Sequence, residues 1–172
     1  WKRGTRIEDA PEIYRGDAKD VSSGAALLRD NEDVIHARIA YRGISFHERL
    51  WYVWKDAQWL QLELPTKANP VGIVDGHMLF SPDVDWTVGD QTFPADSLVA
   101  VNLEEWKANP NGAKKALVWG PGYRQTKQGS TVTAGGLYVA LLDNVVGKVL
   151  KFNFADGKWA SKQVPLPDNA TI

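Results

Sequence analysis

The clearest local pattern lies in the middle of the chain, where two short β-forming segments flank a glycine. Residues 86–88 (Trp-Thr-Val) and 91–93 (Gln-Thr-Phe) stand on either side of Gly89-Asp90. Glycine adopts positive φ without strain, so this dipeptide predicts a tight turn, and the two segments predict a short antiparallel hairpin. The apolar run 98–103 that follows predicts a longer, mostly buried strand.

Alternation of apolar and polar residues predicts a half-buried strand from residue 34 onward. The polar face would carry His36, Arg38 and Arg42. The apolar face would carry Ile35, Ala37, Ile39 and Tyr41. Residues 46–54 and 60–64 then predict a pair of hairpin strands.

Further turn dipeptides divide the rest of the chain into strands. Asp75-Gly76, which favours a two-residue turn, separates segments 71–74 and 77–80. Asp156-Gly157 predicts a similar turn into a last strand. The other predicted strands are residues 116–119, 131–133, 137–142, 148–154 and 158–164.

Four segments lack a β pattern. Residues 1–16 have no clear period, and residues 17–30, which are polar around a short Ala-Ala-Leu-Leu run, predict a connector. Residues 104–109 predict one helical turn. Residues 120–129, bounded by glycines, predict an exposed loop.

A repeat links two distant parts of the chain. Residues 50–65 and 150–165 share the order strand, acidic turn, Trp, strand, Pro, and Trp59 and Trp159 are one hundred residues apart. Two units of about fifty residues, each worth about four strands, fit the blades of a β-propeller. We therefore predict an all-β chain of three to four propeller blades, with an antiparallel sandwich as the alternative.

Composition narrows the classes of function. Eight Trp residues in 172 predict either bulky core side chains or an exposed binding face, and we expect most of them to be buried. A net charge of −1 with scattered basic residues argues against nucleic-acid binding, and no apolar run is long enough for a membrane span. Without cysteine the chain has no thiolate chemistry. It begins at Trp1, which suggests a fragment or a processed product.

Motifs of catalysis are missing from the sequence. A Gly-x-Ser-x-Gly elbow does not occur, and neither does a Gly-x-x-x-x-Gly-Lys-Ser/Thr phosphate loop. His36, His47 and His77 have no shared spacing, so we interpret them as surface or turn residues. We expect no catalytic, cofactor-binding or metal-binding residue.

Three further groups of residues are weak candidates for functional sites. Asp83 and Asp85 alternate on one face, but beside Pro82 they are typical of solvated loop acids. Asn169 begins a glycosylation triplet that is too common to carry weight. The exposed side chains Tyr123, Arg124 and Lys127 could contact a peptide carboxylate, although a basic exposed loop is the simpler interpretation.

The segment 85–98, Asp-Trp-Thr-Val-Gly-Asp-Gln-Thr-Phe-Pro-Ala-Asp-Ser-Leu, together with residues 99–103, resembles the N-terminal propeller region of prolyl oligopeptidase family serine peptidases of bacteria. Residues 1–5, 141–145 and 164–170 are similar to adjoining parts of that region. Relatives often have two glycines where this chain has Gly89-Asp90.

The resemblance implies a fold and a role. Family members join a seven-bladed propeller to an α/β-hydrolase domain, and the propeller limits which peptides reach a Ser-Asp-His triad. By resemblance, residues 1–172 are middle blades of such a propeller, without the catalytic domain. The chain would be inactive alone, with that domain and short peptides as partners of the parent enzyme, in the cytoplasm or periplasm. Open blade edges suggest self-association.

Two alternative functions belong to other classes of protein. A stand-alone propeller could serve as a binding or scaffold module, which would be favoured if its reading frame held no Gly-x-Ser-x-Gly segment downstream. A lectin-like protein would expose its Trp rings, whereas a blade would bury most of them.

Overall fold

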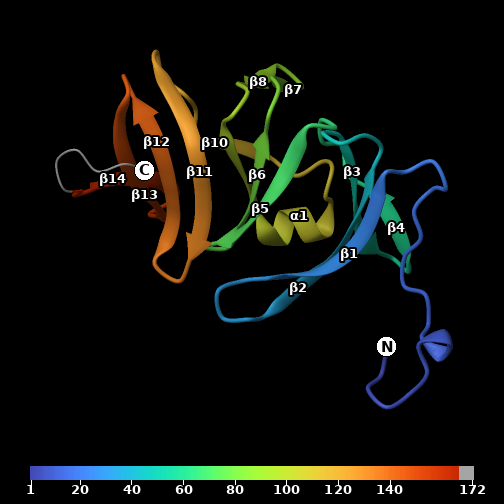
Figure 1. The fold of residues 1–172 in the computed structure, drawn as a ribbon. Helices are drawn as coiled ribbons and strands as arrows, with labels where there is room; N and C mark the ends of the chain where they lie inside the picture. Colours follow the sequence, from blue (N-terminus) through green and yellow to red (C-terminus); the bar gives the residue numbers. More distant parts are fainter. Residues whose placement is uncertain (167–172) are drawn as a thin grey trace.

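The computed structural model describes residues 1–166. In this part of the chain the strands form three four-stranded antiparallel sheets and one two-stranded hairpin (Figure 1). The expected all-β class is confirmed. The described residues contain one α-helix, of six residues, and no helix long and apolar enough to cross a membrane.

The first and third sheets are simple meanders, in which each strand pairs with the next along the chain. The first sheet consists of β1 (Ser22–Arg29), β2 (Ile35–Gly43), β3 (Arg49–Lys55) and β4 (Gln58–Gln61). The third sheet consists of β11 (Gln125–Thr133), β12 (Gly136–Asp143), β13 (Val146–Ala155) and β14 (Lys158–Val164). A 3₁₀ turn, η1 (Ile7–Asp9), precedes the first sheet.

The second sheet has the same up-and-down order but carries two insertions. Its strands are β5 (Ala68–Val74), β6 (His77–Pro82), β9 (Leu98–Asn102) and β10 (Lys115–Trp119). The predicted hairpin, β7 (Trp86–Val88) with β8 (Gln91–Phe93), lies between β6 and β9. Helix α1 (Leu103–Ala108) lies between β9 and β10, and the Asn102 side chain caps its first turn.

The first strands of the three sheets lie beside one another. Strand β5 contacts both β1 and β11, and the three sheets fan out from this line (Figure 1). Each sheet is therefore one blade, with its first strand innermost. The described chain forms three blades of an open, partial propeller, as the sequence predicted.

The second sheet is buried on both faces because it lies between the other two. On β6, Met78 and Phe80 pack into the core shared with the first sheet, whereas Leu79 packs into the core shared with the third. Successive side chains of a strand point to opposite faces. This explains why β6 is buried along its whole length and carries three consecutive apolar residues, 78–80, while strands of the outer sheets alternate.

The predicted turns have the expected backbone. Gly89 has φ 58°. At Asp75-Gly76 and Asp156-Gly157 both residues have positive φ, which is the requirement of the two-residue turns that match strand twist. Two more turns of this kind occur at Asp56-Ala57, the acidic turn of the predicted repeat, and at Asn144-Val145, which was not predicted as a turn.

Two of the predicted connectors are wrong in part. Residues 17–30 include β1, and residues 120–129 include the first half of β11. Both strands are innermost, where strands of different sheets approach: a Cβ added at Gly72 on β5 would meet the Val132 side chain on β11 at 3.2 Å. Small and polar residues fit this space, and they give little β-propensity signal.

The hundred-residue repeat corresponds to two blades. Trp59 lies on β4 and Trp159 on β14, the fourth strands of the first and third sheets. The middle copy is hidden in the sequence because α1 replaces the short turn between its last two strands.

The expectation for the Trp side chains holds only in part. Trp86, Trp106 and Trp119 are buried, and Trp51, Trp59 and Trp159 are half-buried. Trp1 and Trp54 are exposed.

Candidate functional site

Three turns gather at one end of the inner strands and surround a cavity. They are the β1–β2, β5–β6 and β11–β12 connections, and the cavity measures about 310 Å³. Its polar lining includes Asp30, Glu32, His36 and Asp75. In a propeller this position is an end of the central channel, so this cluster is the candidate site.

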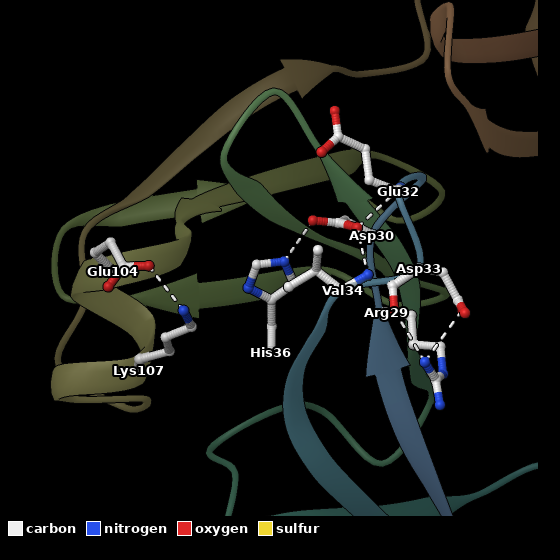
Figure 2. Close-up of polar contacts among 8 residues, drawn as sticks. All are labelled: Arg29, Asp30, Glu32, Asp33, Val34, His36, Glu104 and Lys107. Carbon is white, nitrogen blue, oxygen red and sulfur yellow. Dashed lines mark hydrogen bonds and ion pairs between the residues drawn. The ribbon is translucent and has the colours of Figure 1, made fainter.

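Asp30 organises the β1–β2 turn (Figure 2). Its Oδ1 accepts hydrogen bonds from the backbone N–H groups of Glu32, at 2.9 Å, and Val34, at 3.0 Å. Its Oδ2 lies 2.6 Å from Nε2 of His36 on β2. A carboxylate only accepts, so the His36 ring carries a proton on Nε2.

These contacts set the charge of the site. The hydrogen bond from His36 is the largest effect and holds the pKa of Asp30 below its usual value. Partial removal from water opposes it, and the backbone N–H groups of Val34 and Glu32 each lower the pKa by a smaller amount. Asp30 is therefore ionised at neutral pH, and both of its oxygens are occupied.

The same turn is fixed to its own sheet and to the third sheet. Arg29 donates to the backbone oxygen of Asp33 at 2.9 Å and lies 3.2 Å from its carboxylate (Figure 2). The amide Nδ2 of Asn31 donates to the backbone oxygen of Thr133 at 2.6 Å. Because Thr133 ends β11, this hydrogen bond joins the first blade to the third across the cavity.

Asp75 and His77 join the second blade to the third. The Asp75 carboxylate accepts a hydrogen bond from the backbone N–H of Phe154 at 2.8 Å. His77 donates through Nδ1 to the backbone oxygen of Asp75 at 2.7 Å, and its ring lies 4.1 Å from that of Phe154 and 5.3 Å from that of Trp159. His77 is thus a core residue between two blades.

Helix α1 borders the site on its other side. Lys107 forms an ion pair with Glu104 at 2.8 Å (Figure 2), and Lys55 of β3 donates to the backbone oxygen of Lys107 at 3.0 Å. His36 lines a second cavity here, of about 230 Å³, together with Trp106. The His36 ring therefore separates two cavities.

The side chains of this cluster can bind a polar group and hold it in position. The Asp30–His36 pair has the form of an acid-base dyad, but no hydroxyl nucleophile contacts His36 among the polar contacts of residues 1–166. Within the same residues no three His, Cys, Asp or Glu side chains group as metal ligands do. The cavity can hold a polar chain or water, and its wall is braced by contacts between blades.

The structure separates the three histidines named from the sequence. His47 is exposed, and His77 flanks the Asp75-Gly76 turn, both as interpreted, although the His77 side chain is also buried. The interpretation is wrong for His36, which is half-buried within β2. Sequence analysis assigned no role to Asp30 or Asn31. The run Asp-Asn-Glu-Asp that contains them was a usable signal, because Asp and Asn side chains bond to the backbone of turns.

The acidic pair Asp83 and Asp85 is exposed, as interpreted. Asp85 has a structural contact, since its carboxylate accepts a hydrogen bond from the backbone N–H of Ala95 at 2.9 Å. The triplet that begins at Asn169 lies outside the described residues.

The three loop residues 123, 124 and 127 do not form one site. Tyr123 and Arg124 are exposed in the loop, with the Arg124 guanidinium 5.1 Å from the Tyr123 ring centre. Lys127 lies on β11 and donates to Oγ of Ser81 and to the backbone oxygen of Asp96, both of the second blade. Burial lowers the pKa of Lys127. The prediction of an exposed Lys127 is therefore wrong.

Comparison with known proteins finds relatives along almost the whole chain. An uncharacterized peptidase of Sinorhizobium fredii is 32% identical over 99% of the chain, and an uncharacterized peptidase of Rickettsia prowazekii is 22% identical over 92%. The chain is a homologue of a segment of these peptidases. It spans about a quarter of their length, 24% and 23%. No family model matches the chain.

A solved structure confirms the fold. The structure of a post-proline cleaving enzyme from Rickettsia typhi matches 97% of this chain with a TM-score of 0.82 and 20% sequence identity, over 25% of its own length. The resemblance stated from the sequence is thereby confirmed, because the peptidase relatives and this fold cover the same three blades.

Proposed function

We propose that the chain is part of the propeller of a prolyl oligopeptidase-like serine peptidase, in which it helps to restrict access to an active site carried by another domain. The observation that carries the proposal is the 32% identity to a peptidase over 99% of the chain. The match to a post-proline cleaving enzyme supports the preference for proline-containing peptides.

The candidate site gives this role a physical form. The turn that contains Asp30 and Asn31 reaches from the first blade to the third across one end of the inner strands. In a closed propeller, a braced turn at this position would restrict passage to extended chains and exclude folded proteins. The α/β-hydrolase domain and the short peptides are the partners proposed for the parent enzyme.

The proposal is tested on the product of the longest reading frame that contains this chain, beside the 172-residue chain alone. A chromogenic peptide with proline before the scissile bond should be hydrolysed by the long protein, and a serine-directed inhibitor should abolish the reaction. The 172-residue chain should show no turnover. Inhibitor-sensitive turnover by the short chain, or an inactive long protein without a Gly-x-Ser-x-Gly segment, would contradict the proposal and favour a scaffold module.

Restriction of access is tested by loosening the turn. Asn31→Ala in the long protein removes the link to Thr133, so cleavage of longer peptides should rise relative to that of a dipeptide substrate. Glu104→Ala is the matched control, because Glu104 lies on the helix that borders the site and, within residues 1–166, its carboxylate pairs only with Lys107 of the same helix. Equal ratios in the two variants would exclude this turn as part of the filter.

A further inference from the structure

The cavity on the helix side of His36, of about 230 Å³, lies between the first blade and helix α1 of the second. Its lining includes His36, Val53 and Lys55 of the first sheet and, from α1 and the turn after it, Trp106, Lys107 and Pro110. The cavity is therefore formed by the contact of two blades of this chain. None of these side chains has yet been given a function.

One part of the wall is apolar and deeply buried. Val53 and Trp106 are 4% and 1% exposed, and Pro110 is buried as well. Side chains that are packed in this way keep their positions, so the cavity keeps its shape. Its volume corresponds to about eight waters at about 30 Å³ each, which is also the volume of a small organic molecule.

The other part of the wall is positively charged. Nζ of Lys55 donates to the backbone oxygen of Lys107 at 3.0 Å, and Lys107 pairs with Glu104, whose side chain is 79% exposed. Among residues 1–166 no carboxylate forms an ion pair with Lys55, which is half-buried. The ammonium of Lys55 is thus a partly desolvated charge that the described chain leaves unbalanced.

A charge beside apolar walls is poorly solvated, and an anion in the cavity would offset that cost. We propose that this cavity binds a small carboxylate, whose apolar body packs against Trp106 and Val53 and whose carboxylate accepts a hydrogen bond from Lys55. The backbone oxygen of Lys107 lies beside the same ammonium and repels a dianion more than a monoanion, so inorganic phosphate fits less well. This inference does not rest on the proposed peptidase function.

Phenylacetate is the first probe, because it joins a carboxylate to an apolar ring. Added to the isotope-labelled 172-residue chain, it should give saturable NMR shifts at the Trp106 indole N–H and at Lys55, with a dissociation constant of about 1 mM or below. Phenylethyl alcohol, its neutral analogue, and inorganic phosphate should bind at least about tenfold more weakly. An absence of shifts at about ten times that concentration would overturn the site. Equal affinity for the alcohol or for phosphate would overturn the carboxylate assignment.

Substitution of Lys55 separates its charge from its bulk. Lys55→Met keeps an apolar stem, so it should weaken phenylacetate at least about tenfold and leave the binding of phenylethyl alcohol unchanged. Lys158→Met serves as the control, because Lys158 is exposed on β14 of the third blade, and it should change neither affinity. Unchanged phenylacetate binding by Lys55→Met, or an equal loss of both probes, would contradict the role of the Lys55 charge.

A second variant fills the cavity and leaves both lysines in place. Ala37 also lines it, and Ala37→Leu should abolish the phenylacetate shifts. Ala160→Leu, at an exposed position of β14, should retain them. Circular dichroism and the thermal midpoint of each variant show whether the fold is kept. Phenylacetate shifts that persist in folded Ala37→Leu would place the probe elsewhere and overturn the inference.

Discussion

The carboxylate of Asp75, in a turn of the second blade, accepts a hydrogen bond from the backbone N–H of Phe154 in the third blade, 79 residues later, at 2.8 Å. The same residue has φ 48°. One side chain thus shapes a hairpin turn and fixes the next blade.

Substitution at residue 75 should separate these two roles. Asp75→Asn keeps both an acceptor oxygen and tolerance of positive φ, so it should change the free energy of unfolding little. Asp75→Gly keeps the turn but leaves the Phe154 N–H without its acceptor, which should cost about 1 kcal/mol. Urea unfolding of the two variants measures the difference. Equal stabilities would mean that the contact between blades contributes nothing.

Substitution by glycine at two turns should stabilise the fold. Ala57 has φ 61° and Val145 has φ 64°, a conformation that costs residues with a Cβ roughly 1 kcal/mol or more. Val145 is 89% exposed, so its removal sacrifices little burial. Val145→Gly and Ala57→Gly should each raise the free energy of unfolding by about 1 kcal/mol, as measured by chemical denaturation. The reverse change at the equivalent turn, Gly157→Ala, should destabilise by a similar amount.

Gly136 should be the least tolerant glycine of the third sheet. It has φ 125°, and an added Cβ would lie 2.6 Å from the backbone oxygen of Phe152. Gly136→Ala should therefore lower the free energy of unfolding by at least about 2 kcal/mol. In the same sheet, Gly129 has open space where a Cβ would stand, so Gly129→Ala is the control and should be neutral or slightly stabilising. A neutral Gly136→Ala would contradict the close approach of β12 and β13 at this point.

Alkaline pH should release the segment before β1 from the first sheet. Burial against the sheet, with a smaller effect of Tyr52, raises the pKa of Tyr14 to about 12. The folded protein holds this proton more tightly than the unfolded chain, so the contribution of Tyr14 to stability is full below about pH 10 and is lost as the pH rises to about 12. Absorbance at 295 nm should show one late-titrating tyrosine, and Tyr14→Phe should remove it. An unchanged titration in that variant would assign the high pKa elsewhere.

The turns and the central strands were predictable because their causes are local. Gly89 and Gly76 permit positive φ whatever surrounds them, and the helical turn after Asn102 follows from its own cap. The inner strands were predicted only in part, since β1 was missed and only the ends of β5 and β11 were recognised. Gly72 on β5 lies against Val132 of β11, a strand of another blade, and Gly24 on β1 lies against the Tyr41 ring of its own sheet, so at both positions small residues are selected by space and not by β propensity.

In the sequence the candidate site is marked only by the run Asp-Asn-Glu-Asp of its first turn, and the contacts that assemble the site are not visible. Asn31 and Thr133 are 102 residues apart, and Asp75 and Phe154 are 79 apart. Local patterns give no information about such pairs. Lysine is usually a surface residue, so the sequence gives no reason to place Lys127 between blades. Only the packing of β11 against the second blade brings its ammonium beside Ser81.

The sequence by itself determined the all-β class, the turn positions, the hundred-residue repeat and the resemblance to a peptidase propeller, because these depend on backbone preferences and side-chain order along one strand. The tertiary structure decided which strand of each blade is innermost and which turns meet across the cavity. Those features depend on how three similar sheets pack around a common line, a relation between residues distant in sequence that no single segment encodes.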